Sequence, residues 1–297
     1  MQVGIPGLIS LLPFALLLMA VLGLWIHRNL WIAALTAAVI AAYCTGALTG
    51  LAALWIAMLG GLALWYRRRK SVHGALQTAG WQRVAAGLAF FLFALAMGLL
   101  LFPGFPRTVL VETVVLSPGA LPYSIGLGFP KVVAGIFIVG LIHDERVRSW
   151  GQLRHVLWRV VPVLLVTLVG VMAVALATGY VKLDPKWTPL FLVWAPINLL
   201  FTCFAEEAFF RGFVQRELSG IGADRRLATT VALAVGALLF GLAHFAGGWK
   251  YVVAATLAGV GYGIAYERER RVEAAMTVHF GLNAVHFLLF TYPALAR

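Results

Sequence analysis

Charge is what this sequence has least of. Asp, Glu, Lys and Arg make up 11% of its 297 residues, and 62% are hydrophobic. Soluble domains carry about 25% charged residues, so the shortage excludes an ordinary soluble domain and favours a polytopic membrane protein. Acidic residues are fewer than basic ones: the sequence has 11 Asp and Glu against 23 Lys and Arg, which gives a formal net charge of +12. In a membrane protein, basic cytoplasmic loops account for such an excess, and we expect no nucleic-acid partner.

Cysteine is also nearly absent. The two cysteines, Cys44 and Cys203, lie in separate apolar stretches, so the sequence has no disulfide framework and no Cys-x-x-Cys motif. Internal repeats and low-complexity segments are absent too. The first apolar run lacks the preceding basic segment of a signal peptide, and we expect it to be retained as a first span.

Long apolar runs are abundant. Pro and Gly interrupt residues 103–130, which predicts a long loop on or dipping into the membrane interface. The sequence therefore predicts an all-α, polytopic transmembrane helical bundle of about ten spans, surrounded by the lipid bilayer. The apolar runs cover residues 4–26, 30–45, 47–66, 84–102, 130–143, 158–178, 188–205, 227–246, 251–266 and 273–290.

The basic residues test this count of spans. With the N-terminus outside, 17 of the 23 Lys and Arg residues fall on the cytoplasmic side. Cytoplasmic loops of membrane proteins carry an excess of Lys and Arg. We therefore expect the N- and C-termini outside and the arginine-rich loops in the cytoplasm.

Polar residues divide the chain unevenly. Residues 1–102 have almost none within their spans, so residues 1–130 are predicted to be a membrane scaffold with an interfacial loop, and residues 131–297 to be the functional core. Two glycine pairs, Gly46/Gly50 and Gly259/Gly263, follow the small-xxx-small pattern that lets membrane helices approach closely. We expect these glycines to serve packing.

Two adjacent carboxylates, Glu206 and Glu207, lie in apolar sequence, where a charge costs about 3 kcal/mol or more. On a helix, Arg211 is four residues from Glu207 and shares its face, so the two can pair. Glu206 points about 100° away from Glu207 and receives no partner from this segment. It can lie deep in the membrane only if its helix continues unbroken to about Leu218.

Three further polar residues, His244, His279 and Asn283, lie in apolar helices of the same region. A Glu shielded from water can act as general base toward a bound water, and a His can orient that water or protonate a leaving amine. His279 and Asn283, one helical turn apart, can both donate to one oxyanion. Together with Glu206 they fit peptide-bond hydrolysis, and we expect no cofactor. Two His and a Glu could equally hold zinc, although the sequence has no His-Glu-x-x-His motif.

Three stretches, Glu206-Glu207-x-x-x-Arg211, Phe240-x-x-x-His244 and His279-x-x-x-Asn283, resemble the three ordered motifs of the CAAX protease and bacteriocin-processing (CPBP) family. The resemblance covers roughly residues 188–290. It implies an intramembrane endopeptidase with its catalytic core in the C-terminal helices. The family is often labelled a metalloprotease, but a metal-free glutamate mechanism fits it better.

The resemblance also implies roles for single residues. Glu206 would activate water together with His244, while His279 and Asn283 would form the oxyanion site. Glu207 and Arg211 would be supporting residues, either a structural pair or a site for a substrate carboxylate. His286 and Cys203 match no motif, and we interpret both as packing residues.

The implied partner is a membrane-associated peptide or protein: a prenylated tail, a bacteriocin leader or another membrane protein. Because the family is mostly prokaryotic, we expect a multi-pass protein of a bacterial cytoplasmic membrane. Two other functions stay open. A non-catalytic family member could bind a partner or confer immunity, although intact motifs argue against it. A proton-coupled transporter could use the same Glu and His, although transporters commonly repeat their broken helices in two halves.

Overall fold

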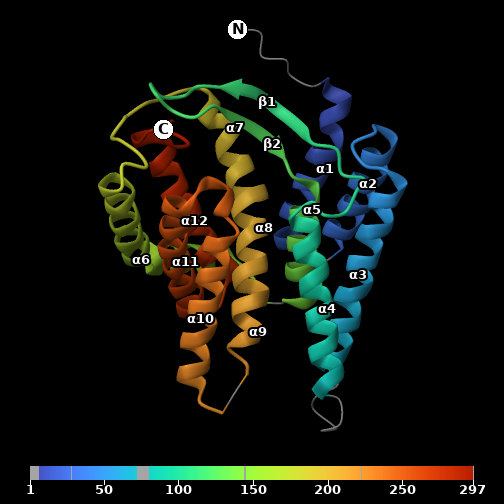
Figure 1. The fold of residues 1–297 in the computed structure, drawn as a ribbon. Helices are drawn as coiled ribbons and strands as arrows, with labels where there is room; N and C mark the ends of the chain where they lie inside the picture. Colours follow the sequence, from blue (N-terminus) through green and yellow to red (C-terminus); the bar gives the residue numbers. More distant parts are fainter. Residues whose placement is uncertain (1–6, 28, 72–79, 144, 222, 297) are drawn as a thin grey trace. The chain divides into compact units, whose positions relative to one another are not determined.

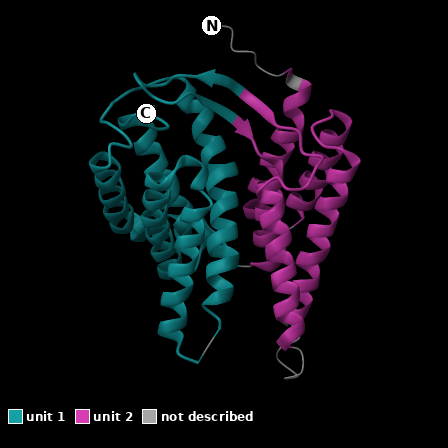
Figure 2. Ribbon diagram, in the orientation of Figure 1, with its two compact units in different colours: residues 1–4, 111–125, 145–297 teal, residues 5–110, 126–144 magenta. Residues whose placement is uncertain are grey.

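The computed structural model describes residues 7–27, 29–71, 80–143, 145–221 and 223–296. These residues form helices and one two-stranded sheet, so the predicted all-α class is confirmed (Figure 1). The chain divides into two compact units (Figure 2). Of the described residues, those within 111–125 and 145–296 belong to unit 1, and those within 7–110 and 126–143 belong to unit 2. The predicted functional division at residue 130 stays a prediction.

Each of the predicted apolar stretches is helical over most of its length. Within the described residues, seven helices are long and apolar enough to cross a membrane, judged by length and composition. The stretches Leu30–Cys44 and Phe129–Ile142 are apolar but shorter, and α11 (Trp249–Glu269) is long but is not among the seven. The seven are Ile9–Ile26, Gly50–Lys70, Gly80–Gly98, Trp150–Ala177, Leu190–Leu218, Arg225–Leu242 and Val272–Leu289.

Unit 2 is held together by apolar packing. Its helices bury Leu17, Leu59 and Phe90 completely. Gly46 lies in the turn after α2 at φ +75°, with nothing within 4 Å of an added Cβ atom, and Gly50 begins α3. The prediction that Gly46 serves helix packing is therefore wrong, because the turn requires its positive φ. The helices are α1 (Leu8–Ile26), α2 (Leu30–Cys44), α3 (Gly50–Ser71), α4 (Gly80–Gly98) and α5 (Phe129–Phe137), which continues as a π-helix over Ile138–Ile142.

Unit 1 packs its helices around α11. A Cβ atom added at Gly259 would lie 3.1 Å from the Cα of Ala237, and one added at Gly263 would lie 2.9 Å from the Gln215 Oε1. The close packing predicted for this glycine pair is therefore confirmed. Side-chain caps at Ser149 and Asp224 begin two of the helices. Around α11 stand α6 (Trp150–Ala177), α10 (Arg225–Leu242) and α12 (Val272–Leu289).

One further helical segment of unit 1 runs without a break from Leu190 to Leu218, which confirms the predicted continuation of the Glu206 helix. Two of its sections are π-helical, a rare geometry that is frequent at functional sites. Pro196 lies just before the first of them and lacks the N–H that would bond a carbonyl one turn earlier. The sections are α7 (Leu190–Ile197), a π-helix (Asn198–Cys203), α8 (Phe204–Glu207), a second π-helix (Ala208–Gln215) and α9 (Arg216–Leu218).

The predicted interfacial loop contains a sheet of two strands, β1 (Thr108–Val114) and β2 (Tyr123–Leu127). The β-branched residues of β1 favour this extended structure. In unit 1, residues 115–125, 178–188 and 290–296 are joined by backbone hydrogen bonds, and together they are named the end cap below. The bonds include Leu121 N–H to Ala294 O (2.8 Å), Thr291 N–H to Lys182 O (2.9 Å) and Leu295 N–H to Tyr180 O (3.0 Å).

Candidate active site

A cavity of about 270 Å³ in unit 1 brings the predicted residues together. Its wall contains Glu206 from α8, His244 from the turn after α10, and His279 and Asn283 from α12. Small-molecule pockets are typically about 300–1,000 Å³, so this space fits a few residues of an extended chain and not a folded partner. Three segments far apart in sequence therefore supply one cavity.

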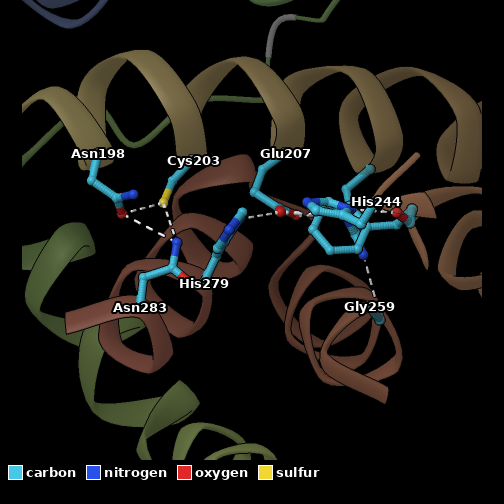
Figure 3. A network of polar contacts seen from close by, with 9 residues as sticks. Asn198, Cys203, Glu207, His244, Gly259, His279 and Asn283 are labelled. Atoms are coloured by element: carbon cyan, nitrogen blue, oxygen red, sulfur yellow. Dashed lines mark hydrogen bonds and ion pairs between the residues drawn. The ribbon is translucent and has the colours of Figure 1, made fainter. Parts of the chain in front are cut away.

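Glu207 lies at the centre of a buried polar network (Figure 3). Its Oε2 is 3.1 Å from Arg211 Nη1, and both side chains are 0% exposed. His279 Nδ1 donates to the Glu207 Oε1 at 2.7 Å. The ion pair predicted from the four-residue spacing is confirmed. Neither Glu207 nor Arg211 lines the cavity, which favours the structural pair over a site for a substrate carboxylate.

The Arg211 guanidinium is surrounded by groups that compensate its burial. Besides the ion pair, Nη2 donates to the carbonyl oxygen of Gly259 at 2.9 Å. The guanidinium carbon is 4.7 Å from the ring centre of Phe240 and 5.3 Å from that of Tyr262. A buried charge is tolerated when it is paired and hydrogen-bonded, and aromatic faces add cation–π attraction. The pair thus anchors the motif helix to α10 and α11.

His244 has a defined proton position. It lies in the turn that follows α10, partly exposed, and its Nδ1 is 2.7 Å from the carbonyl oxygen of Phe240. Because a carbonyl only accepts, Nδ1 carries the proton, and the neutral ring has its lone pair on Nε2. The ring packs edge-on against Tyr251, with 5.0 Å between ring centres. This nitrogen is therefore available to accept a hydrogen bond from a water.

His279 is fixed in the same way, through the Glu207 carboxylate. A carboxylate accepts, so Nδ1 of His279 carries a proton and Nε2 is the nitrogen left for the cavity. Tyr262 stacks on the ring at 4.5 Å between centres and 15° between planes. Nε2 can donate to an oxyanion only when the ring carries a second proton.

Asn283 contacts two residues of the first π-helical section (Figure 3). Its Nδ2 donates to the Asn198 Oδ1 at 3.2 Å and lies 3.9 Å from the Cys203 sulfur. Cys203 itself donates to the same Asn198 oxygen at 3.3 Å. Asn198 is a site residue that the sequence reasoning missed. Cys203, interpreted as packing, is buried and is part of this cluster.

Tyrosines make up much of the remaining wall. Tyr123 and Tyr292 come from the end cap, and the Tyr292 hydroxyl accepts a hydrogen bond from Trp194 Nε1 at 3.1 Å. Burial raises the pKa of both phenols above the ordinary value, so both are protonated hydroxyls at neutral pH. His286, interpreted as a packing residue, also lines the cavity, and its Nε2 bonds to the Thr291 carbonyl oxygen at 3.2 Å.

Among the described residues, no group of three His, Cys, Asp or Glu side chains is placed so that it could hold a metal ion. The expectation of no cofactor stays a prediction.

A family model described as type II CAAX prenyl endopeptidase Rce1-like matches residues 185–285. The match covers about a third of the chain and supports the resemblance of this region to the CAAX protease and bacteriocin-processing family. The matched residues contain all three motifs, and in unit 1 they run from just before α7 into α12. This region is therefore similar to CAAX-type prenyl endopeptidases. Searches of curated proteins and of solved structures gave no match.

Proposed function

We propose that the protein is an intramembrane endopeptidase that hydrolyses a peptide bond with a water activated by Glu206. The observation that carries the proposal is that Glu206, His244, His279 and Asn283, predicted from three separate motifs, line one cavity. The substrate is a membrane-associated peptide or protein segment, as the family suggests.

In the first step, Glu206 takes a proton from the bound water while the water oxygen attacks the peptide carbonyl carbon. The unprotonated Nε2 of His244 accepts a hydrogen bond from the second O–H of that water and so holds the water in place. General acid–base catalysis of this kind contributes about 10²–10⁴-fold to a rate.

The developing oxyanion is stabilised by His279 and Asn283. Asn283 uses one N–H on Asn198 and has a second N–H for the oxyanion. His279 donates from protonated Nε2 while Glu207 holds its other nitrogen. The tetrahedral intermediate then collapses, the C–N bond breaks, and the departing amine takes the proton from Glu206. Glu207 is in this scheme a positioning residue, because it acts through His279.

The test compares the purified wild-type protein with Glu206→Gln in detergent, with a chelator present, on fluorogenic lipidated and unlipidated peptides. We expect cleavage by the wild type and a loss of about 10²–10⁴-fold in Glu206→Gln. Glu112→Gln makes the same chemical change at an exposed position of β1 and should leave activity intact. Cys203→Ala should retain cleavage, which would exclude a thiol nucleophile.

Two results would contradict the proposal. Cleavage that survives Glu206→Gln would remove Glu206 as the base. Cleavage that appears only without chelator would replace the metal-free scheme with a metal-dependent one. If the wild-type protein cleaves none of the peptides, the non-catalytic, partner-binding alternative gains support.

A further inference from the structure

Basic residues distinguish the two ends of unit 1. At one end α6, α10 and α12 begin and α9 and α11 finish; at the other end lies the end cap. The first end, named the arginine end, carries ten arginines, whereas the described residues of the end cap and the first turn of α11 contribute three lysines. The arginines are Arg146, Arg148, Arg154, Arg159, Arg216, Arg225, Arg226, Arg268, Arg270 and Arg271, and the lysines are Lys182, Lys186 and Lys250.

Two of these three lysines are bonded to the protein's own backbone. Lys186 Nζ donates to Phe290 O and to the Asp184 carboxylate, and Lys250 Nζ donates to Thr178 O. The excess of arginine at the arginine end lies in short loops next to membrane spans. In such loops, an excess of Lys and Arg marks the cytoplasmic side. The arginine end is therefore the cytoplasmic end of unit 1.

The cavity belongs to the opposite end. Its wall includes Tyr123, Tyr180 and Tyr292 from the end cap, Tyr251 from the first turn of α11 and His286 from the last turn of α12. Among the described residues, none of the arginines at the arginine end lines it. His279, seven residues into α12, lies roughly 10 Å along the helix from its first residue. The cavity thus extends from the end cap to the middle of the helices.

We infer that the cavity takes its substrate from the non-cytoplasmic side of the membrane. The inference about the side from which the substrate enters rests on the proposed function, whereas the orientation of unit 1 in the membrane does not. The substrate class is then a polypeptide segment exposed on the outer face, such as an exported peptide or an outward-facing stretch of a membrane protein. Four tyrosines line the cavity beside the end cap, so the cavity favours uncharged side chains next to the cleaved bond.

Cysteine labelling tests the orientation. In a Cys44→Ser background, which removes the exposed native thiol and keeps the buried Cys203, two matched variants are made. Ala296→Cys places a thiol in the end cap, and Ala223→Cys places one beside the arginine end; both alanines are exposed. Each is labelled with a membrane-impermeant maleimide in intact and in permeabilised spheroplasts, and the ratio of the two signals is measured.

We expect a ratio near one for Ala296→Cys and a ratio near zero for Ala223→Cys. Any result in which the ratio for Ala296→Cys does not exceed that for Ala223→Cys overturns the inference, whether or not the protein cleaves peptides.

Vesicles test the substrate side with the peptide that the detergent assay identifies. Right-side-out vesicles should cleave added peptide at least about tenfold faster than inverted ones, with detergent removing the difference. Faster cleavage by inverted vesicles would overturn the inference while supporting the proposed protease. A lack of cleavage in detergent would instead contradict the proposed function, and the labelling result would still decide the orientation.

Discussion

The two units are built from similar apolar helices but differ in what lies inside them. Of the ten buried polar or charged side chains among the described residues, nine belong to unit 1, and His143 is the one in unit 2. Unit 2 fills its interior with Leu, Ala and aromatic side chains, whereas unit 1 contains the network of Arg211, Glu207 and His279.

The difference has a physical meaning in a membrane. Lipid tails are as apolar as leucine, so apolar side chains alone give helices little reason to associate and do not select one arrangement strongly. A buried ion pair or amide pair has few acceptable partners and therefore fixes which residues face each other. In unit 1 the polar network fixes how the helices pack around the side chains that must act together. In unit 2 the helix packing depends on filling the interior with apolar side chains.

The largest expected effect is the loss of stability when the buried ion pair of unit 1 is broken. Arg211→Met leaves Glu207 as a buried carboxylate without its cation, which should cost about 3–5 kcal/mol in free energy of unfolding. Arg68→Met makes the same change at an exposed position of α3 in unit 2 and should cost less than about 0.5 kcal/mol. Unfolding in mixed detergent micelles measures both.

The double variant Glu207→Gln/Arg211→Met should recover part of that loss, because no charge is then left buried. Equal losses in Arg211→Met and Arg68→Met would remove the proposed difference between the units.

An intermediate effect is expected on activity. Asn198→Ala removes the oxygen that holds Asn283, and a hydrogen bond worth about 1 kcal/mol corresponds to a loss of roughly fivefold in kcat/KM. Thr45→Ala removes a comparable side-chain hydrogen bond at the end of α2 in unit 2 and should leave cleavage unchanged. The two variants are compared in the fluorogenic assay. If Asn198→Ala is as active as the wild type, Asn283 does not depend on this partner.

The smallest effect concerns pH and the end cap. A hydrogen bond with Ser117 is the main cause that lowers the pKa of Asp184 below its ordinary value of 3.8, and Lys186 adds to it. A lowered pKa stabilises the fold above the ordinary value, and the stabilisation is lost as the pH falls through the folded-state value. The unfolding temperature of the wild type should therefore fall more steeply below about pH 4 than that of Asp184→Asn. Parallel curves for the two proteins would contradict this role.

Much of unit 1 could be predicted because its polar residues violate the rule of apolar helices. The pair of Glu207 and Arg211 follows from a spacing of four, and the continuous helix to Leu218 follows from the need to bury Glu206. The contact between His279 and Glu207 could not be derived, because it joins helices 72 residues apart and depends on how they rotate. The strands of residues 108–127 were missed because Pro and Gly around them indicated a loop.

Asn198 was missed for a different reason. Residues five apart on an α-helix lie about 140° apart around its axis, so Asn198 and Cys203 do not appear to share a face. They are bonded here because the helix between them is π-helical.

That wider turn makes the site depend on chain length as well as on side chains. A residue in a π-helix turns through about 80° and one in an α-helix through about 100°, so six π-helical residues span nearly the same angle as five α-helical ones. The loss of one residue within Asn198–Cys203, such as Leu200, would therefore let this section become α-helical with Glu206 and Glu207 still directed as they are now. At unchanged length, an α-helical Asn198–Cys203 would instead rotate both carboxylates by roughly 100° relative to α7, away from the cavity and from His279. A relative that keeps the length of this stretch must also keep its wider turn if the three motifs are to meet.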